Sequence, residues 1–561
     1  MKITACSIVK NEAQNIARSI QSYKDAVDEI IIVDTGSTDN TVEICKSNGT
    51  KVLLHQWNND FSAAKNYALE HATGDWIIFL DADEWFEPKL SRFMLINIIK
   101  KAQINQSNAI MTTLCEYNCK TNKVIMKVLI TRIFKNSRHI RFEGAIHERI
   151  TDSGKDIEQE CFTGIEIFHS GYANGLAKIK SKRNIEILNS QFNKGEVNTY
   201  LYFYIFRENY LLDNIDEAEK FFDLFMSCKD AEDIIETNTA IISVYEYMYR
   251  IMIQKPEKYS PEDVKKFLLD AVDKYPGVPI LSYFIGCEMI KSDYGQSYKW
   301  LMNAINTNQE YNSYFVNSFI ACLADTYYKL GYISHNIGND EQALGFYLKA
   351  VREAESSDLL VILQGILDII GTQPEEEIIL FLNSFLDITK EDIIRLILTS
   401  LKKTRLHKTF IYYAIKYNRE FNGQDETTYI AMILTGQAEL AVETAIAAYI
   451  NSKNTLKQID GIGNVTNDDK EINDINNEDV SKKWHLDYAV IAILYSKRLD
   501  LFKKHKDSFS LAQGEIIEAY LGNKKLLKTT EIVKKEYNKI REDIEYILNE
   551  RNLKNFDSII F

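Results

Sequence analysis

Two carboxylates stand at the end of an apolar run, in the segment GDWIIFLDADEWFEP at residues 74–88. They are Asp81 and Asp83, and in an extended chain residues two apart point to the same side, so both can address one point in space. Carboxylate oxygens are hard ligands that suit Mg²⁺ or Mn²⁺. A cation held there could bridge two phosphates and neutralise the charge that develops on a departing nucleoside diphosphate. Two acids spaced in this way are common by chance, so the pair gains its meaning from its place at the end of a strand.

A third carboxylate ends another apolar run in EIIIVDTGSTDNTVEI, residues 29–44. The run predicts a buried strand that ends at Asp34, a tight turn through Gly36, and a helix that Ser37 or Thr38 caps. A carboxylate at this strand end can accept the imide N–H of a uracil and so select uridine nucleotides. It can equally well only cap or solvate the turn, and the segment by itself does not decide between these two interpretations.

The elements that position these carboxylates alternate along the first part of the chain. Apolar runs (ITACSIV, EIIIVD, KVLLH and WIIFLDAD) are separated by amphipathic stretches at residues 12–24, 40–48 and 61–72. Such alternation is typical of an α/β domain of the Rossmann-like kind, with a mostly parallel sheet and helices on both faces. Ligands of these sheets bind at the carboxyl ends of the strands, where the three carboxylates are expected.

After residue 175 the pattern becomes almost wholly helical. Large and small residues recur at the spacing of a tetratricopeptide repeat, a helix–turn–helix unit of about 34 residues; they are Tyr327, Leu330, Gly331, Ala343, Tyr347 and Ala350. A looser copy runs through 199–228, and a general α-helical bundle is the alternative interpretation. Stacked helical pairs form a concave groove, which commonly holds a peptide segment.

These changes of pattern predict four segments of the chain: an α/β domain over 1–175, a tetratricopeptide-like helical domain over 176–451, a flexible linker or loop over 452–482, and a C-terminal helical region over 483–561. The third segment, SKNTLKQIDGIGNVTNDDKEINDINNEDVSK, is rich in Asn, Asp and Lys and poor in aromatic residues. Such a composition is typical of a mobile connection, because it offers little apolar surface to bury.

The composition limits the kinds of partner. With 66 basic and 80 acidic residues the net charge is −14, which argues against binding to nucleic acid or to an anionic membrane, because either needs positive counter-charge. The 8 cysteines are scattered, as in a reducing compartment, and Cys115 and Cys119 have no second pair of ligands at zinc-site spacing. No apolar run reaches the roughly 18–20 residues of a transmembrane helix, and no signal-peptide layout opens the sequence. We therefore expect a cytoplasmic protein.

Three blocks of the sequence resemble the family-2 glycosyltransferases of the GT-A fold: SIVKNEAQNI, VDTGSTDNT and WNNDFSAAKNYALEHATGDWIIFLDADE. Their order and spacing fit over residues 1–90, and a looser resemblance extends to about residue 175. The sequence is most similar to the subgroup with a helical-repeat tail, which includes sublancin-type S-glycosyltransferases and bacterial flagellin glycosyltransferases. The resemblance implies that six side chains contact or border the nucleotide-sugar: Asn11, Glu12, Asp34, Asp60, Lys65 and Asp81.

The same resemblance implies roles for two later blocks, IRFEGAIHERI and IFHSGY. Glu148 would be the base that takes the acceptor proton, and His147 would contact the diphosphate or orient that base. Asp83 and His169 would hold the metal ion, because neutral imidazole is a suitable ligand for Mn²⁺. The other histidines of this region have no such neighbours and are expected to be structural; they are His55, His71 and His139.

Three positions depart from the family pattern. Thr35 replaces a second acid that often stands beside Asp34, Lys65 stands where arginine is usual, and Glu148 stands where many members carry aspartate. None of these changes removes a group that the chemistry requires.

Together these features predict an inverting, metal-dependent glycosyltransferase. It would move a hexose or N-acetylhexosamine from a UDP-sugar, with Mn²⁺ or Mg²⁺, to a Ser, Thr or Cys side chain of a bacterial protein or peptide such as flagellin. The helical repeats would hold this polypeptide acceptor, form a homo-oligomer, or do both. The alternatives are a cell-envelope saccharide acceptor, of the lipopolysaccharide-core type, and a repeat scaffold with a vestigial sugar-nucleotide domain. A dinucleotide-dependent dehydrogenase is excluded because no G-x-G-x-x-G follows the first strand.

Overall fold

A computed structural model describes residues 1–521 apart from 120, 158, 171–175, 196, 238–241, 312–315, 403, 422–425, 438, 447–483 and 497, and a few residues between 535 and 541. The predicted linker over 452–482 lies outside the described residues, as does most of the chain after residue 521. The chain divides into two compact units, Met1–Ile333 and Ser334–Phe561.

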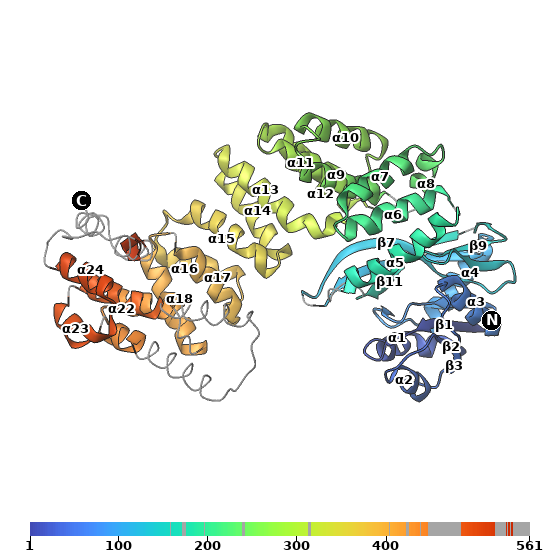
Figure 1. Cartoon of the computed structure of the whole chain (residues 1–561), viewed down its shortest axis with the longest axis horizontal. Coiled ribbons are helices and arrows are strands. Elements are labelled where there is room, and N and C mark those ends of the chain that lie inside the picture. Colours follow the sequence, from blue (N-terminus) through green and yellow to red (C-terminus); the bar gives the residue numbers. More distant parts are fainter. Residues whose placement is uncertain are drawn as a thin grey trace. The chain divides into compact units, whose positions relative to one another are not determined.

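The first unit begins with a large sheet whose strands are β1 (Ile3–Val9), β2 (Glu29–Asp34), β3 (Lys51–Leu54), β4 (Trp76–Phe79), β5 (Glu84–Phe86), β6 (Ala109–Asn118), β7 (Lys123–Lys135) and β11 (Gln159–His169). Their order is β3-β2-β1-β4-β7-β6-β11-β5, and Figure 1 labels β1, β2, β3, β7 and β11 among them. The pairs β1–β2, β2–β3, β1–β4 and β6–β11 are parallel, whereas β7 and β5 pair antiparallel with their neighbours. Six of the eight strands thus share one direction, and the mostly parallel α/β fold predicted from the sequence is confirmed.

Both faces of this sheet are covered, because alternate strand residues enter two different hydrophobic cores. Trp76 and Ile78 point into the core that α1, α2 and α4 close, whereas Ile77 and Phe79 point into the core that α3 and a small sheet close. Burial of each such side chain stabilises the fold by about 1.5–3 kcal/mol. The covering elements are α1 (Ile16–Tyr23), the short turn η1 (Lys24–Ala26), α2 (Thr41–Ser47), α3 (Phe61–His71), α4 (Arg92–Ile104), β8 (Ile140–Glu143), β9 (Arg149–Asp152) and β10 (Lys155–Asp156).

The register of the parallel strands brings their carboxyl ends to one edge. Val9 at the end of β1 pairs with Asp34 at the end of β2, and Cys6 pairs with Phe79 at the end of β4. The residues that follow these strands therefore lie close together, as the alternation of strands and helices predicts.

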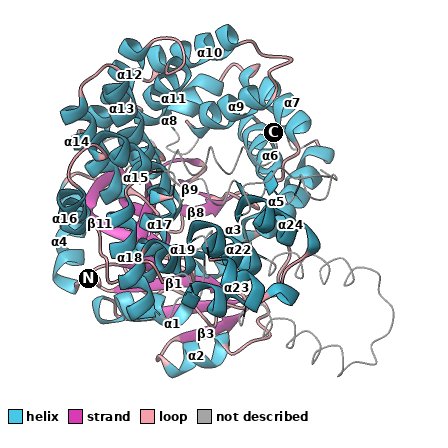
Figure 2. Cartoon of the chain, turned by 90° about the vertical axis from the view of Figure 1, so that its left-hand side faces the viewer, coloured by secondary structure: helices cyan, strands magenta, loops and turns pink. Residues whose placement is uncertain are grey.

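From α5 onward, the named elements of the described residues are helices, and Figure 2 distinguishes them from the strands of the preceding part. Local sequence explains their starts: Asn198 caps α6, and Ser260 forms a capping box with Asp263 at the start of α10, where Pro261 is the first helical residue. In the first unit they are α5 (Leu176–Asn193), α6 (Thr199–Leu211), α7 (Ile215–Met226), α8 (Ala231–Thr237), α9 (Ser243–Gln254), α10 (Pro261–Lys274), α11 (Pro279–Met289), α12 (Tyr294–Gln309), η2 (Phe319–Cys322) and α13 (Leu323–Asn336), whose last residues belong to the second unit.

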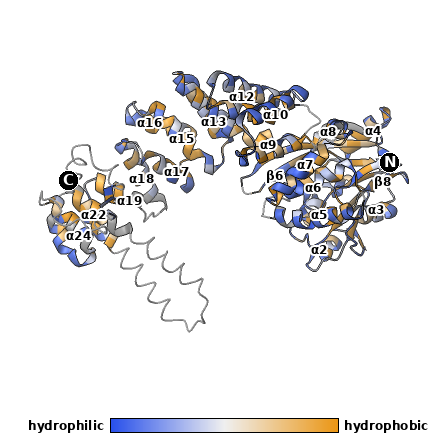
Figure 3. Cartoon of the chain, turned by 45° about the horizontal axis from the view of Figure 1, so that its top comes forward, coloured by the Kyte–Doolittle hydropathy of each residue, from blue (hydrophilic) through white to orange (hydrophobic). Residues whose placement is uncertain are grey.

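Neighbouring helices pack in pairs, α6 with α7 and α11 with α12. At the second pair the backbones approach closely, because a Cβ added to Gly286 would lie 2.7 Å from Leu301 Cδ2. Figure 3 shows hydrophobic and hydrophilic residues along the same helices, for example α12 and α13, as expected of helices that bury one face.

A short backbone contact joins the helices of the first unit to its sheet. The N–H of Asn317 donates to the carbonyl of Lys127 on β7 at 2.7 Å, and the N–H of Lys127 donates back to the carbonyl of Asn317 at 3.2 Å. The long hairpin of β6 and β7 is therefore held by residues that lie far along the chain.

The second unit is helical in its described part. On α14, the predicted repeat residues Ala343, Tyr347 and Ala350 are buried, and Gly365 on α15 allows close approach because a Cβ there would lie 2.6 Å from the ring of Tyr347. No helix among the described residues is long and apolar enough to cross a membrane. The helices are α14 (Asp340–Glu353), α15 (Ser356–Ile370), α16 (Glu375–Phe385), α17 (Glu391–Leu401), α18 (His407–Phe421), α19 (Glu426–Leu434), α22 (Trp484–Ser496), α23 (Leu499–Lys504), η3 (Lys506–Ser508) and α24 (Leu511–Leu521).

Candidate active site

A cavity of about 530 Å³ in the first unit lies where the parallel strands end. Burial raises the pKa of Glu12, one of its acidic lining residues. The sheet, its loops and helix α3 contribute most of the predicted residues to this lining: Glu12, Lys65, Asp81, Asp83, His147, Glu148 and His169. Helices α5 and α6 supply a further wall, with Lys180, Ser181, Arg183, Asn184, Arg207, Glu208 and Leu211.

Five charged side chains form a continuous row of ion pairs in this cavity. Lys65 on α3 is 2% exposed, and its Nζ lies 2.5 Å from Glu148 Oε1 and 3.1 Å from Asp81 Oδ1. Arg132 on β7 continues the row, because its Nη2 lies 2.8 Å from Asp81 Oδ2 and 2.5 Å from Glu84 Oε1. Burial alone would raise the pKa of Asp81, but the charges of Lys65 and Arg132 lower it. Two cations thus fix three carboxylates, one of which is the predicted base.

His169, at the end of β11, lies between two carboxylates. Its Nε2 is 3.2 Å from Asp83 Oδ2, and its Nδ1 is 2.7 Å from Glu116 Oε2. Burial alone would lower the pKa of His169, but its hydrogen bonds to Asp83 and Glu116 raise it well above the ordinary value. Lys180 on α5 also reaches this point, because its Nζ lies 3.3 Å from Asp83 Oδ2.

The donor atoms of this group fit a divalent cation. A histidine that binds a metal through one nitrogen usually donates its other N–H to a carboxylate, and Glu116 has this relation to His169. Among the described residues, no cluster of three or more His, Cys, Asp and Glu side chains is arranged to hold a metal. Asp83 and His169 offer one oxygen and one nitrogen donor at the same point of the cavity.

His147 contacts helix α6 rather than Asp83 or His169. Its ring stacks on Tyr204, with centroids 4.1 Å apart and planes inclined by 20°. Its Nε2 lies 3.0 Å from Arg207 Nη2 and 3.2 Å from Glu208 Oε1. Burial and the charge of Arg207 lower the pKa of His147 to about 4, so the imidazole is neutral near pH 7.

Three predicted residues are not among those that line the cavity. Both oxygens of Asp34 accept backbone N–H groups of its own turn, at 3.1 and 3.2 Å. Asn11 Oδ1 accepts the N–H of Thr38 at 2.7 Å, and Asp60 caps α3 by accepting the N–H of Ala63 at 2.9 Å. Their side chains are thus already bonded to the backbone, and Val9 and Thr35 face the cavity at this edge instead.

The sequence interpretation missed several residues of the site, among them Arg132 and Glu116. Both lie inside long strands, and the carboxylate and imidazole that they contact are far away in the sequence. A signal was present, because Arg132 is a charged residue inside the apolar run VLITRIF and is nonetheless buried. Charged residues are seldom fully buried unless they are paired, so such a residue marks a partner elsewhere.

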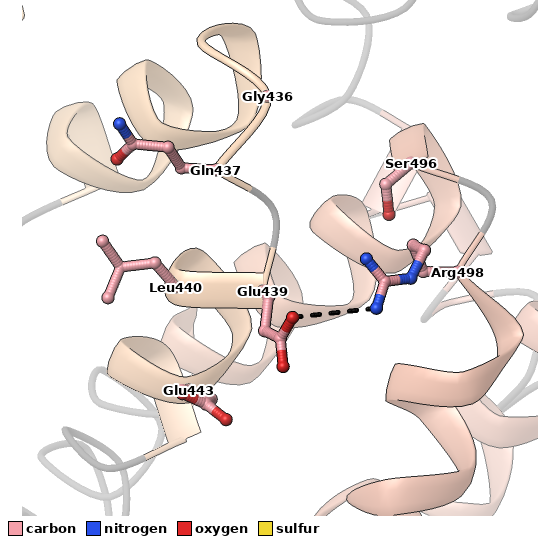
Figure 4. A pocket seen from close by; sticks show the side chains of 7 residues that line it. All are labelled: Gly436, Gln437, Glu439, Leu440, Glu443, Ser496 and Arg498. Atoms are coloured by element: carbon pink, nitrogen blue, oxygen red, sulfur yellow. Dashed lines mark ion pairs between the residues drawn. The ribbon is translucent and has the colours of Figure 1, made fainter.

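A second hollow, of about 590 Å³, belongs to the second unit (Figure 4). Its charged groups are Arg498 and Glu439, 3.7 Å apart, with side chains 44% and 52% exposed. Water screens such an exposed pair, and the hollow contains none of the predicted residues. It is lined by Gly436, Gln437, Glu439, Leu440, Glu443, Ser496 and Arg498.

A family model described as Glycosyl transferase family 2 matches residues 4–148. A TPR repeat-containing protein of Synechococcus elongatus is 38% identical over 159 residues, which are 28% of this chain and 38% of that protein. The SPbeta prophage-derived glycosyltransferase SunS of Bacillus subtilis is 30% identical over 220 residues, 38% of this chain and 51% of that protein. The chain thus spans about half or less of the length of these relatives. Among solved structures, glucosyl-3-phosphoglycerate synthase of Mycobacterium tuberculosis matches 20% of this chain and 44% of its own, at 20% identity and a TM-score of 0.18.

The matched segment begins in β1 and ends at Glu148. It contains the lysine, the two aspartates and the glutamate whose side chains meet in the cavity. The N-terminal part of this chain therefore contains a domain that matches the Glycosyl transferase family 2 model, and a long helical region follows it.

Proposed function

We propose that the protein is a glycosyltransferase that moves a sugar from a nucleoside diphosphate to an acceptor in the cavity of the first unit. The observation that carries the proposal is the meeting of Asp81, Asp83 and Glu148 in one cavity, within a segment that matches the family model. A repeat scaffold with an idle sugar-nucleotide domain has no need of a buried lysine that pairs with both Asp81 and Glu148.

The donor is a UDP-sugar, bound with Mn²⁺ or Mg²⁺. Asp83 and His169 would hold the metal ion, which when bound neutralises charge on the departing diphosphate. Lys180 adds a positive charge beside Asp83. Asp34 and Asn11 shape the turn at the end of β2, and Thr35 and Val9 give this edge of the cavity its surface for the nucleoside.

Glu148 is the base of an inverting transfer. The acceptor O–H or S–H gives its proton to the Glu148 carboxylate while the acceptor atom forms a bond to the anomeric carbon. The bond between that carbon and the diphosphate oxygen breaks, and the nucleoside diphosphate leaves with the electron pair. Lys65 keeps the Glu148 carboxylate in place through their 2.5 Å ion pair.

The acceptor is a Ser, Thr or Cys side chain of a polypeptide. Support comes from the wall that α5 and α6 add to the cavity and from aromatic groups beside them. Trp57 packs edge-to-face on Phe61 at 4.7 Å, and the Arg183 guanidinium lies 5.0 Å from the Phe61 ring centre. A surface with aromatic rings and a cation suits a mixed apolar and polar peptide segment.

The test measures UDP release from a panel of UDP-sugars, with Mn²⁺, with Mg²⁺ and with EDTA, for the native protein and for Asp83→Asn. We expect Asp83→Asn to lower turnover by about 10²-fold or more, because a metal ligand is lost, and EDTA to abolish turnover. Asp75→Asn is the matched control, since Asp75 is exposed at the opposite end of the same strand. Undiminished release by Asp83→Asn would contradict the assignment of Asp83 as a metal ligand. A native protein that releases no UDP from any UDP-sugar would contradict the proposal that the donor is a UDP-sugar.

A further inference from the structure

The segment that carries Glu148 alternates between two environments. His147 and Arg149 contact helix α6, whereas Glu148 between them contacts Lys65 in the cavity. Arg149 Nη1 donates to the Tyr200 hydroxyl at 3.0 Å, and its guanidinium lies 4.3 Å from the centre of that ring. Both neighbours of the proposed base are therefore bound by one helix.

The four contacting residues form one face of α6. Tyr200, Tyr204 and Glu208 are spaced four residues apart and therefore project from the same side of the helix, and Arg207 lies beside them. They contact the segment in reverse order, because Tyr200 contacts Arg149 while the other three contact His147. This face of α6 therefore contacts the segment on both sides of Glu148.

His147 has a backbone conformation that needs such support. Its φ is +53°, in the left-handed region that residues with a Cβ adopt only at an energetic cost. A strained residue persists only where its surroundings fix it. Here the surroundings are the stacked ring of Tyr204 and the charges of Arg207 and Glu208.

Glu208 anchors this contact from inside the protein. Its side chain is 1% exposed and lies 2.6 Å from Arg207 Nη2 as well as 3.2 Å from His147 Nε2. Burial alone would raise the pKa of Glu208, but the hydrogen bonds and charges of His147 and Arg207 lower it to about 2. The anchor is therefore a fixed negative charge at every pH at which the enzyme would work.

We propose that helix α6 positions the catalytic base, with Tyr204 and Glu208 as positioning residues that act through His147. The inference rests on the proposed role of Glu148 and extends it to the helical region beyond the family domain. The left-handed turn at His147 sends the following side chain away from α6 and toward Lys65, and the α6 face holds that turn in place. Nothing in this arrangement requires α6 to touch the donor diphosphate.

The test compares Tyr204→Ala with Tyr204→Phe, which keeps the stacked ring. Turnover is measured as UDP release from a UDP-sugar with Mn²⁺ and water as acceptor, and UDP affinity by calorimetry. We expect Tyr204→Ala to lower kcat by about 10²-fold, the effect of a misplaced catalytic group, without a change in KM for the UDP-sugar or in UDP affinity. Tyr204→Phe should turn over like the native protein, and Glu208→Ala should resemble Tyr204→Ala.

Tyr210→Ala is the matched control, because Tyr210 stacks on Tyr247 at 4.8 Å from the same helix and does not line the cavity. An equal loss of kcat in Tyr210→Ala would mean that the helix is merely destabilised, and native turnover in Tyr204→Ala would mean that α6 does not position the base. Provided that Glu148→Gln is inactive, either result overturns the inference about α6 and leaves the proposed role of Glu148 intact. Native turnover in Glu148→Gln overturns the proposed base and the inference together.

Discussion

At the scale of the residue, the site is a set of charges that are paired before any substrate binds. Lys65 and Arg132 are both buried, and each contacts two carboxylates. Removing one partner from such a buried group leaves an uncompensated charge, which costs about 3–5 kcal/mol. Substitutions here therefore change stability as well as turnover, and neutral isosteres are the informative variants.

His147 gives the site a pH dependence of known sign. Its pKa is about 4 in the folded protein and 6.5 ordinarily, so only the unfolded chain gains a proton as the pH falls through 6.5. Folding stability is therefore lost between about pH 6.5 and pH 4, by roughly 2 kcal/mol between pH 8 and pH 5. Urea unfolding of the native protein and of His147→Asn at both pH values measures the difference, which the variant should lack. Of the groups that face His147, Glu208 has a pKa of about 2 and stays ionised throughout this range.

At the scale of the element, Asp60 is both a predicted binding residue and the start of a helix. Its carboxylate caps α3, the helix that carries Lys65. We expect Asp60→Ala to lower stability by about 1 kcal/mol through loss of the cap, while Asp60→Asn keeps most of it and neither changes KM for the UDP-sugar. Asp293→Ala is the matched control, since Asp293 caps α12 in the same way. A raised KM at native stability would instead make Asp60 a donor contact.

The same distinction explains how far the sequence could go. Apolar runs reveal where strands end, so the meeting of Asp81 and Asp83 in one site could be predicted from the order of residues alone. Whether a strand-end carboxylate faces the cavity or its own turn depends on backbone geometry, and for Asp34 the turn amides take both oxygens. Arg132 could not be assigned a partner, because pairing across the sheet depends on strand order, which no local pattern contains.

At the scale of the whole molecule, the predicted boundary at residue 175 passes through the site. Strands end at His169 and helices begin at Leu176, as the change of pattern predicts. The cavity nevertheless continues to Leu211 on α6. The segments 1–175 and 176–451 remain a prediction about folding, whereas the lining of the cavity extends beyond the segment that matches the family model.

Removal of the second unit tests how much of the chain the proposed activity requires. Every residue that lines the cavity belongs to Met1–Ile333, so a protein shortened after Gly338 should release UDP from a UDP-sugar at the native rate. A protein shortened after residue 175 lacks Arg207 and Glu208 and should release none. Turnover of each, measured with Mn²⁺ at equal folded concentration, checks both expectations. Loss of turnover in the longer piece would mean that the second unit contributes to catalysis.

The backbone pairing of Asn317 with Lys127 has a consequence for how the protein is made. A ribosome delivers the chain from its N-terminus, and domains generally begin to fold as they emerge. The hairpin that carries Glu116 and Arg132 is fastened by a residue synthesised long after it, and α6 also arrives late. A nascent chain that has just completed the family domain would therefore hold an unfinished site. The proposed site would be complete only after the chain has been translated as far as Asn317.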